Sequence, residues 1–180
     1  MKNVYVVRHC KAEGQSADAR LTDFGVQQAY YLAEFFIDKH IDHIISSPYE
    51  RAYRTITPLA DHLGLEIVMD DRLTERVLSA ENHLEWRDML HRTYDDVDLC
   101  YEGGESSRTA MSRIVAVVME VLNSRYNHIV IVSHGNLISL LLKHFDDRIG
   151  FSEWEALSNP DVYQLSYVND ISRIQRTWED

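Results

Sequence analysis

Two short apolar segments that each end in a histidine constrain the fold of this chain more than any other feature. The segment VYVV at residues 4–7 is followed by Arg8 and His9, and the segment HIVIVS at residues 128–133 is followed by His134. Short, uninterrupted runs rich in β-branched residues are typical of strands buried on both faces of a parallel sheet. We therefore predict two buried strands, each with a histidine at its carboxyl end.

The rest of the chain alternates between helix-like and strand-like patterns. Apolar residues recur at helical spacing after Thr22, a typical helix N-cap, and Pro48 suits the first turn of a second helix. The predicted helices cover residues 22–39, 48–63, 106–124 and 136–145, and further strands cover residues 43–47 and 66–69. Two alternating segments, 163–168 and 171–178, meet at Asn169-Asp170 and predict a terminal hairpin or edge strands.

This alternation predicts an α/β protein, a three-layer α/β/α sandwich in which helices cover both faces of a mainly parallel sheet. Residues 77–103 are polar, aromatic and weakly periodic, so we interpret them as a small inserted cap outside the core. A chain of 180 residues can bury a sizeable core in one unit. We expect a single domain over residues 1–180.

The charge and composition of the chain argue against several classes of partner. Eighteen basic and 29 acidic side chains give a net charge of −11, which repels nucleic acid and anionic membranes. The apolar runs are shorter than the ~20 residues of a membrane helix, and the N-terminus does not fit a signal peptide. Two cysteines, Cys10 and Cys100, cannot form a disulfide framework. We expect a cytoplasmic protein, and nothing in the sequence indicates its oligomeric state.

The residues at the ends of the two apolar strands fall where an α/β protein binds its ligand. The carboxyl ends of parallel strands lie at one edge of the sheet, and ligands bind in the crevice beyond that edge. Arg8 and His9 follow one predicted strand, and Ser133 and His134 end the other. We predict that these side chains line a common site.

Six motifs follow one another along the chain. They are Arg8-His9, LTDFGVQQA from Leu21, SSPYERAYRT from Ser46, LTER from Leu73, GGES from Gly103 and SHG from Ser133. Together they resemble the histidine phosphatase, or phosphoglycerate mutase-like, superfamily over nearly the whole chain, and its small-cap phosphatase branch in particular. One such motif arises easily by chance, whereas six in the family's order do not. The resemblance implies a phosphatase that acts on a small phosphorylated metabolite without a metal or cofactor.

The resemblance implies a phosphohistidine mechanism, and the chemistry of the residues agrees with it. A phosphate monoester carries close to two negative charges, which must be offset before a nucleophile approaches. Arg8 and Arg51 can each present paired N–H donors to phosphoryl oxygens, and His134 adds another donor. Neutral His9 can then accept the phosphoryl group while a backbone carbonyl holds its other ring nitrogen. Glu75 is the expected acid for the departing alcohol and base for the water.

The resemblance also implies a second set of residues around the phosphate. These are Thr22, Ser106 and Gly135, with Gly104 and Glu105 shaping the wall near the second histidine. A helix N-cap explains Thr22 equally well, and the turn before Pro48 explains Ser47 equally well.

Cys10 departs from the family pattern, because the residue after the nucleophilic histidine is usually small. Cysteine phosphatases carry an arginine shortly after their cysteine, at positions that Ser16 and Ser106 occupy here, so neither cysteine fits that class. Beside an electropositive pocket we expect Cys10 to form a thiolate that is sensitive to oxidants. No histidine or carboxylate group has the spacing of a metal site, and no phosphate-binding glycine loop occurs.

Three functions remain open at this level. A phosphatase admits water to the phosphohistidine, a mutase excludes it until a second hydroxyl accepts the phosphoryl group, and a silent member only binds a phosphorylated ligand. The cap at residues 77–103 is small and the expected phosphate-binding residues and acid are all present. We therefore favour hydrolysis.

Overall fold

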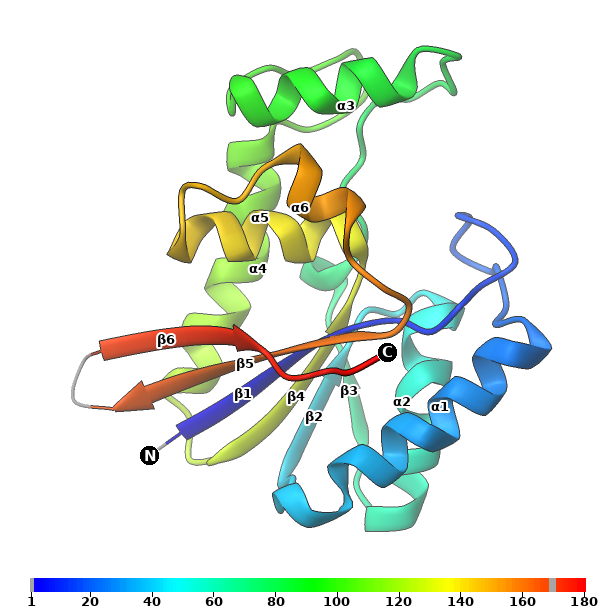
Figure 1. Cartoon of the computed structure of the whole chain (residues 1–180), viewed down its shortest axis with the longest axis vertical. Coiled ribbons are helices and arrows are strands. Elements are labelled where there is room, and N and C mark those ends of the chain that lie inside the picture. Colours follow the sequence, from blue (N-terminus) through cyan, green and yellow to red (C-terminus); the bar gives the residue numbers. More distant parts are fainter. Residues whose placement is uncertain (1, 169–170) are drawn as a thin grey trace.

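The computed structural model describes residues 2–168 and 171–180, and six strands within these ranges form one sheet (Figure 1). The strand order is β3 (Ile67–Met69), β2 (His43–Ser46), β4 (His128–Ser133), β1 (Lys2–Arg8), β5 (Asp161–Val168) and β6 (Ile171–Arg176). The pairs β3 with β2, β2 with β4 and β4 with β1 are parallel, whereas β5 and β6 add antiparallel pairs. The predicted mainly parallel sheet is confirmed.

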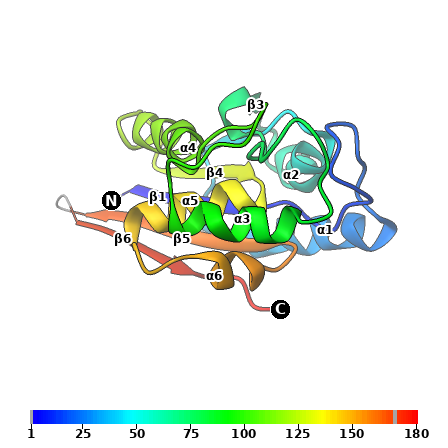
Figure 2. The ribbon, with the colours of Figure 1, turned by 90° about the horizontal axis from the view of Figure 1, so that it is seen from above.

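Helices cover both faces of this sheet, so the predicted three-layer arrangement is also confirmed. On one face lie α1 (Asp23–Phe36) and α2 (Glu50–Leu63). On the other lie α3 (Trp86–Asp95), α4 (Ser107–Leu122), α5 (Gly135–Phe145) and α6 (Phe151–Glu155). Figure 1 shows the two groups below and above the sheet, and Figure 2 shows α3 beside α6. Short 3₁₀ helices occupy Ile37–Lys39 and Asp71–Leu73.

The side chains of β1 explain why both faces need cover. Val4 and Val6 pack into one core cluster with α4 and α5, whereas Tyr5 and Val7 pack into a second cluster with α1 and α2. Successive side chains of a strand point to opposite faces, so one apolar run supplies both clusters. The buried strand predicted at residues 4–7 is therefore confirmed.

Residues 77–103 contribute to the core, so the interpretation that this segment lies outside it is wrong. Helix α3 turns Leu90 and Tyr94 inward, and both belong to the cluster that includes α4 and α5. The Tyr94 hydroxyl and Ser139 Oγ of α5 form a hydrogen bond of 2.5 Å. The pattern was weak because one short helix with a single buried face carries few apolar residues. A cap with boundaries at 77–103 stays a prediction.

The ends of some elements differ from those predicted. Helix α2 begins at Glu50 instead of Pro48, because the chain first makes a turn in which Ser47 Oγ accepts the N–H of Tyr49. Strand β5 lies inside the sheet between β1 and β6, so β6 alone of this pair is an edge strand. The turn predicted at Asn169-Asp170 lies outside the described residues.

Candidate active site

His9 lies directly after β1, with both ring nitrogens engaged. Its Nδ1 donates to the backbone carbonyl of Cys10 at 2.7 Å, which leaves a lone pair on Nε2. The Nε of Arg51 donates to that Nε2 at 3.3 Å. The backbone carbonyl that the sequence analysis expected behind the ring is therefore supplied by Cys10. The attacking position of the imidazole faces the Arg51 guanidinium.

The surroundings of His9 keep its imidazole neutral. The side chain is 7% exposed, and burial is the main cause that lowers its pKa from the usual 6.5 to about 3. The positive charges of Arg51 and Arg8 lower the pKa further, and the hydrogen bond to Cys10 opposes the shift only in part. A neutral ring with an unprotonated nitrogen is the form in which a histidine can act as a nucleophile, and Nε2 is that nitrogen once Arg51 Nε moves away from it.

His134 ends the neighbouring strand β4 and lies against His9. The two ring centroids are 5.2 Å apart in an edge-to-face arrangement. The Nε2 of His134 is 2.8 Å from Ser47 Oγ, and its Nδ1 is buried with no hydrogen-bond partner among the described residues. Burial first, then the charges of His9, Arg51 and Arg8, hold the pKa of His134 well below its usual value. The parallel pairing of β1 and β4 thus brings the two strand-end histidines together.

The guanidinium of Arg8 lies between the backbone carbonyl of Leu157 and Gly135. Its Nη1 donates to the carbonyl of Leu157 at 2.8 Å, while its Nε is buried and no residue in the described part of the chain accepts its hydrogen. A Cβ atom at position 135 would lie 2.8 Å from that Nε, which is closer than a Cβ atom approaches any other heavy atom without a bond. Gly135 therefore makes room for the Arg8 guanidinium at the first residue of α5.

Arg51 is a fully buried arginine on α2. Its Nη1 donates to the carbonyl of Ser16 at 2.7 Å, and its guanidinium lies 5.2 Å from the Tyr49 ring centre. Burial lowers the pKa of Arg51 and of Arg8, and the charge of Glu75 raises both. Among the described residues neither arginine takes part in an ion pair. Two largely buried cations without a carboxylate in contact favour the binding of an anion.

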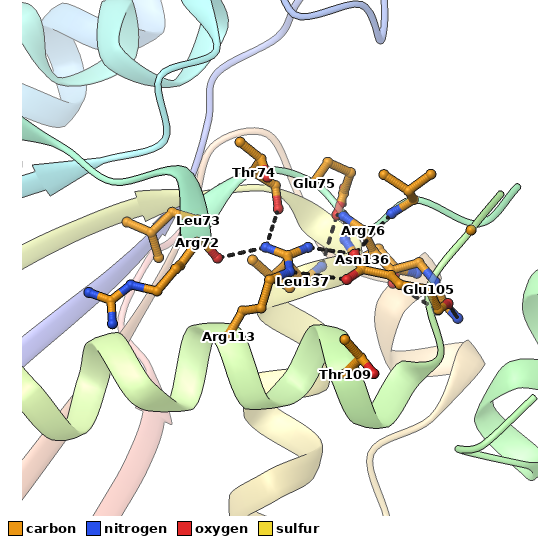
Figure 3. A network of polar contacts seen from close by, with 12 residues as sticks. Arg72, Leu73, Thr74, Glu75, Arg76, Glu105, Thr109, Arg113, Asn136 and Leu137 are labelled. Atoms are coloured by element: carbon orange, nitrogen blue, oxygen red, sulfur yellow. Dashed lines mark hydrogen bonds and ion pairs between the residues drawn. The ribbon is translucent and has the colours of Figure 1, made fainter. Parts of the chain in front are cut away.

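The carboxylate of Glu75 caps the first turn of α5 (Figure 3). Its Oε2 accepts the N–H of Asn136 at 3.1 Å, and its Oε1 accepts the N–H groups of Leu137 at 3.0 Å and Arg76 at 2.8 Å. A helix N-terminus attracts negative charge, which fixes the carboxylate there. The Oε2 atom, with a single donor, is the less engaged oxygen.

The backbone that carries Glu75 is braced from α4. Arg113 donates to the carbonyls of Arg72 at 2.7 Å and Thr74 at 3.1 Å, and Figure 3 shows its guanidinium between this loop and Glu105. Glu105 in turn accepts from Arg113 and from the backbone N–H of Val77. The resemblance implied that Glu105 shapes the wall near the second histidine. In the structure its carboxylate contacts Arg113 and Val77, which support the loop that carries Glu75.

Two residues from the second predicted set, Thr22 and Ser106, cap helices, and their contact with phosphate stays a prediction. Thr22 Oγ accepts the N–H of Gly25 at 3.0 Å as the N-cap of α1. Ser106 Oγ accepts the N–H of Thr109 at 3.1 Å as the N-cap of α4. Their hydroxyls satisfy helix termini, so capping accounts for both residues. Ser47, by contrast, joins the cluster through His134.

The expectation that Cys10 is an oxidant-sensitive thiolate is wrong. The side chain is 0% exposed, and burial raises the pKa of its thiol to about 12. Its backbone N–H donates to Thr55 Oγ1 at 2.8 Å, which ties this position to α2. Arg8 lies two residues away in the sequence, but the thiol is fully buried and burial outweighs the effect of positive charge on its pKa.

Several contributors to the site were missed by the sequence analysis. Arg76 is 6% exposed beside Glu75, and the sequence analysis assigned it no role. Asn159 Nδ2 donates to the His9 carbonyl at 2.9 Å, in the turn that also holds Arg8. The Asn-Pro pair at positions 159 and 160 marks a turn in the sequence, but nothing local to it indicates contact with residues 8 and 9.

A cavity of about 580 Å³ opens beside Glu75 and Tyr49. Tyr49 connects it to the histidines, since its ring centre lies 5.0 Å from that of His134. The remaining lining residues are Gln15, Arg76, Val77, Leu78, Ser79, Glu81, Asn82, His83 and Trp86. Within the described part of the chain no three histidine, cysteine or carboxylate side chains are grouped in a way that could hold a metal ion.

Comparison with known proteins assigns this arrangement to a class. The family model of the histidine phosphatase superfamily (branch 1) matches residues 4–179. The chain belongs to the histidine phosphatase superfamily.

Some relatives are named as phosphatases and others as mutases. A putative phosphoserine phosphatase 2 of Hydrogenobacter thermophilus is 31% identical over 79% of this chain and 77% of its own. A probable phosphoglycerate mutase of Erwinia tasmaniensis is also 31% identical, over 79% of this chain and 74% of its own. Among solved structures, a mycobacterial glucosyl-3-phosphoglycerate phosphatase with inorganic phosphate superposes with a TM-score of 0.78. It is 25% identical and covers 99% of this chain and 96% of its own.

Proposed function

We propose that this protein hydrolyses a small phosphate monoester through a phosphohistidine formed on His9. The observation that carries the proposal is the neutral His9 ring, whose Nε2 lone pair faces the guanidinium of the fully buried Arg51. The phosphatase names among the relatives support the same class of reaction.

In the first half-reaction the Nε2 lone pair of His9 attacks phosphorus and the bond from phosphorus to the ester oxygen breaks. Arg8, Arg51 and His134 surround the phosphoryl oxygens and offset their charge, which is the largest contribution an enzyme makes to phosphoryl transfer. Arg51 Nε gives up its contact with His9 to bind a phosphoryl oxygen. The departing alcohol oxygen takes its proton from Glu75 in its protonated carboxyl form, through Oε2, the oxygen with fewer backbone donors among the described residues.

In the second half-reaction Glu75 accepts a proton from a water molecule, and the resulting hydroxide oxygen attacks phosphorus. The nitrogen–phosphorus bond breaks, orthophosphate leaves, and the electron pair returns to His9 Nε2. Throughout both steps the Nδ1–H of His9 stays hydrogen-bonded to the Cys10 carbonyl, which keeps the ring in one tautomer and orientation.

The proposal includes the wider setting of the enzyme. It acts without a metal or cofactor, on a small phosphorylated metabolite, and within a single domain whose cap comprises about residues 77–103. A cytoplasmic location fits the two free cysteines. Across residues 2–168 and 171–180, the structure contains no helix with the length and apolarity needed to cross a bilayer.

Hydrolysis of para-nitrophenyl phosphate in the presence of a chelator tests the proposal. We expect wild-type activity to survive the chelator and to be lost in His9→Ala and in the more conservative His9→Asn. His144→Ala, which removes an exposed histidine of α5, serves as the matched control. With a substrate whose phosphoryl group is radioactively labelled, protein quenched in acid should carry no label. Protein quenched in base should carry labelled phosphohistidine. Full activity of His9→Asn would overturn the mechanism.

A mutase is the second candidate, because several of the relatives carry that name. It would transfer the phosphoryl group between phosphoglycerates and would depend on a bisphosphate primer. Primer-dependent exchange faster than release of orthophosphate would replace hydrolysis as the function. Binding of phosphate without turnover of any ester would instead indicate a silent member of the family.

A further inference from the structure

The cavity beside Glu75 is where the alcohol part of a bound ester has to lie. Tyr49 and Glu75 both line this cavity. The Tyr49 ring centre lies 5.0 Å from that of His134, and the charge of Glu75 acts on Arg8 and Arg51. A phosphoryl group between the histidines and arginines therefore directs its ester oxygen toward Glu75 and the space beyond. The side chains that line this space determine which alcohol the enzyme accepts.

One part of the cavity wall is aromatic and apolar. Trp86 is 48% exposed and Val77 is 45% exposed, although both are large hydrophobic side chains. The Trp86 ring is supported from behind by an edge-to-face contact with Trp154, at 6.4 Å between ring centres. With Tyr49 and Leu78 on the same lining, the cavity presents apolar surface to a ligand. Exposed aromatic and aliphatic side chains in a cavity wall favour a flat apolar group on the ligand.

The charges of the cavity wall are opposite in sign to those of the phosphate-binding residues. Glu75 and Glu81 both line the cavity. The one arginine in the lining, Arg76, is 6% exposed, and its guanidinium already donates to the Glu105 carbonyl and to side-chain oxygens. A carboxylate on the alcohol would therefore lie near the charge of Glu81 and near a cation that is already engaged, while Glu75 acts as the acid.

We propose that the substrate of this enzyme is the phosphate ester of an uncharged alcohol with an aromatic ring, and that Trp86 and Glu81 set this preference. The inference rests on the proposed phosphatase function. Trp86 stacks on the ring of the alcohol, and Glu81 disfavours alcohols that carry a carboxylate. Phosphoglycerates are accordingly poor substrates.

Three esters of primary alcohols distinguish the effect of the cavity on kcat/KM from the effect of leaving-group basicity. Benzyl phosphate, glycerol 1-phosphate and 3-phosphoglycerate have leaving groups of similar basicity, so differences in kcat/KM report on the cavity. We expect benzyl phosphate to exceed glycerol phosphate by at least about tenfold. We expect 3-phosphoglycerate to be the poorest of the three.

Variants then assign the preference to residues. Trp86→Ala should reduce the ratio of kcat/KM for benzyl phosphate to that for glycerol phosphate by roughly threefold to tenfold, and Trp86→Phe should retain most of it. Glu81→Gln should raise kcat/KM for 3-phosphoglycerate relative to glycerol phosphate by roughly twofold to fivefold. Leu84→Ala is the control, because Leu84 is 98% exposed in the same segment and outside the lining.

The outcomes distinguish this inference from the proposed function. If all three esters are hydrolysed but 3-phosphoglycerate or glycerol phosphate equals benzyl phosphate, the substrate class is wrong and the phosphatase stands. Equal ratios in wild type, Trp86→Ala and Leu84→Ala would likewise overturn the role of Trp86. If the wild type hydrolyses none of the esters, nor para-nitrophenyl phosphate, the proposed function fails and this inference falls with it.

Discussion

Gly135 and the guanidinium of Arg8 occupy adjoining space, so that a Cβ atom at position 135 would lie 2.8 Å from Nε and 2.9 Å from Cζ of Arg8. The atoms that block a side chain are the far end of a flexible residue, not backbone. A larger residue at position 135 is therefore compatible with the fold but not with the observed position of Arg8. The geometry ties a helix-initiating glycine to the arginine of the neighbouring strand.

Gly135→Ala should uncouple activity from stability. We expect kcat/KM for para-nitrophenyl phosphate to fall roughly 100-fold, since displacing a binding group by about an ångström has an effect of that size. The free energy of unfolding in urea should change by no more than about 1 kcal/mol, because alanine is a better helix former than glycine. Gly150→Ala is the control, as its nearest contact would be an ordinary 3.7 Å. Unchanged activity in Gly135→Ala would show that Arg8 does not bind the phosphoryl group from this position.

Arg51→Lys tests whether paired donors, and not charge alone, are required. The Nε of Arg51 contacts His9 while its Nη1 donates to the Ser16 carbonyl, so the guanidinium spans two partners. A lysine keeps the charge but has no fork of donors. We expect kcat/KM to fall roughly 100-fold, as when one fixed donor to a transition state is removed.

The control for Arg51→Lys is Arg54→Lys, three residues along the same helix. Arg54 is half exposed and only 3.9 Å from Glu50 in a surface ion pair, so its replacement should leave kcat/KM within about twofold. Equal rates for Arg51→Lys and wild type would contradict a bidentate role for Arg51.

The sequence predicted the parts of the site that lie at strand ends. The strand at residues 4–7 places Arg8 and His9, and the strand at residues 128–133 places His134, because parallel neighbours end at one edge of the sheet. The order of the layers follows from the same alternation of strands and helices. Both inferences depend on patterns that are local in the chain.

The remaining parts depend on contacts between distant segments, which leave no local pattern. Asn159 holds the His9 carbonyl across a sequence separation of 150 residues, and Arg76 is buried by partners on α4 and near the start of α5. Tyr94 belongs to the segment interpreted as a cap outside the core, but its hydroxyl reaches Ser139 of α5. For Cys10 the electropositive pocket suggested a thiolate. The side chain is instead fully buried, and burial raises the pKa of the thiol.

The two cysteines should differ sharply in reactivity. Cys10 is 0% exposed and burial raises the pKa of its thiol to about 12, whereas Cys100 is exposed. We expect a disulfide reagent to modify Cys100 alone in the native protein and both cysteines in urea. Activity should persist after modification of the native protein and in Cys100→Ser. Loss of activity in step with modification of Cys10 would show that this thiol is accessible after all.

The two buried histidines should make the protein less stable in mild acid. His9 has a folded-state pKa of about 3 against about 6.5 when unfolded, so between these values the unfolded chain binds more protons. The free energy of unfolding therefore falls as the pH falls below 6.5. His134 acts in the same direction, because its pKa is also lowered by burial. For His9 the loss from about pH 7.5 to about pH 5 should be about 2 kcal/mol.

Urea unfolding of wild type and His9→Asn at these two pH values measures that contribution. The variant lacks the titrating ring, so the wild type should lose about 2 kcal/mol more than the variant on going to the lower pH. The buffers must be free of phosphate, because an anion bound at the site would stabilise the folded state and raise the histidine pKa values. His144→Asn, at an exposed position, should follow the wild type. The same pH dependence in wild type and His9→Asn would show that His9 is not held neutral by its surroundings, and the nucleophile would then need a base to deprotonate it.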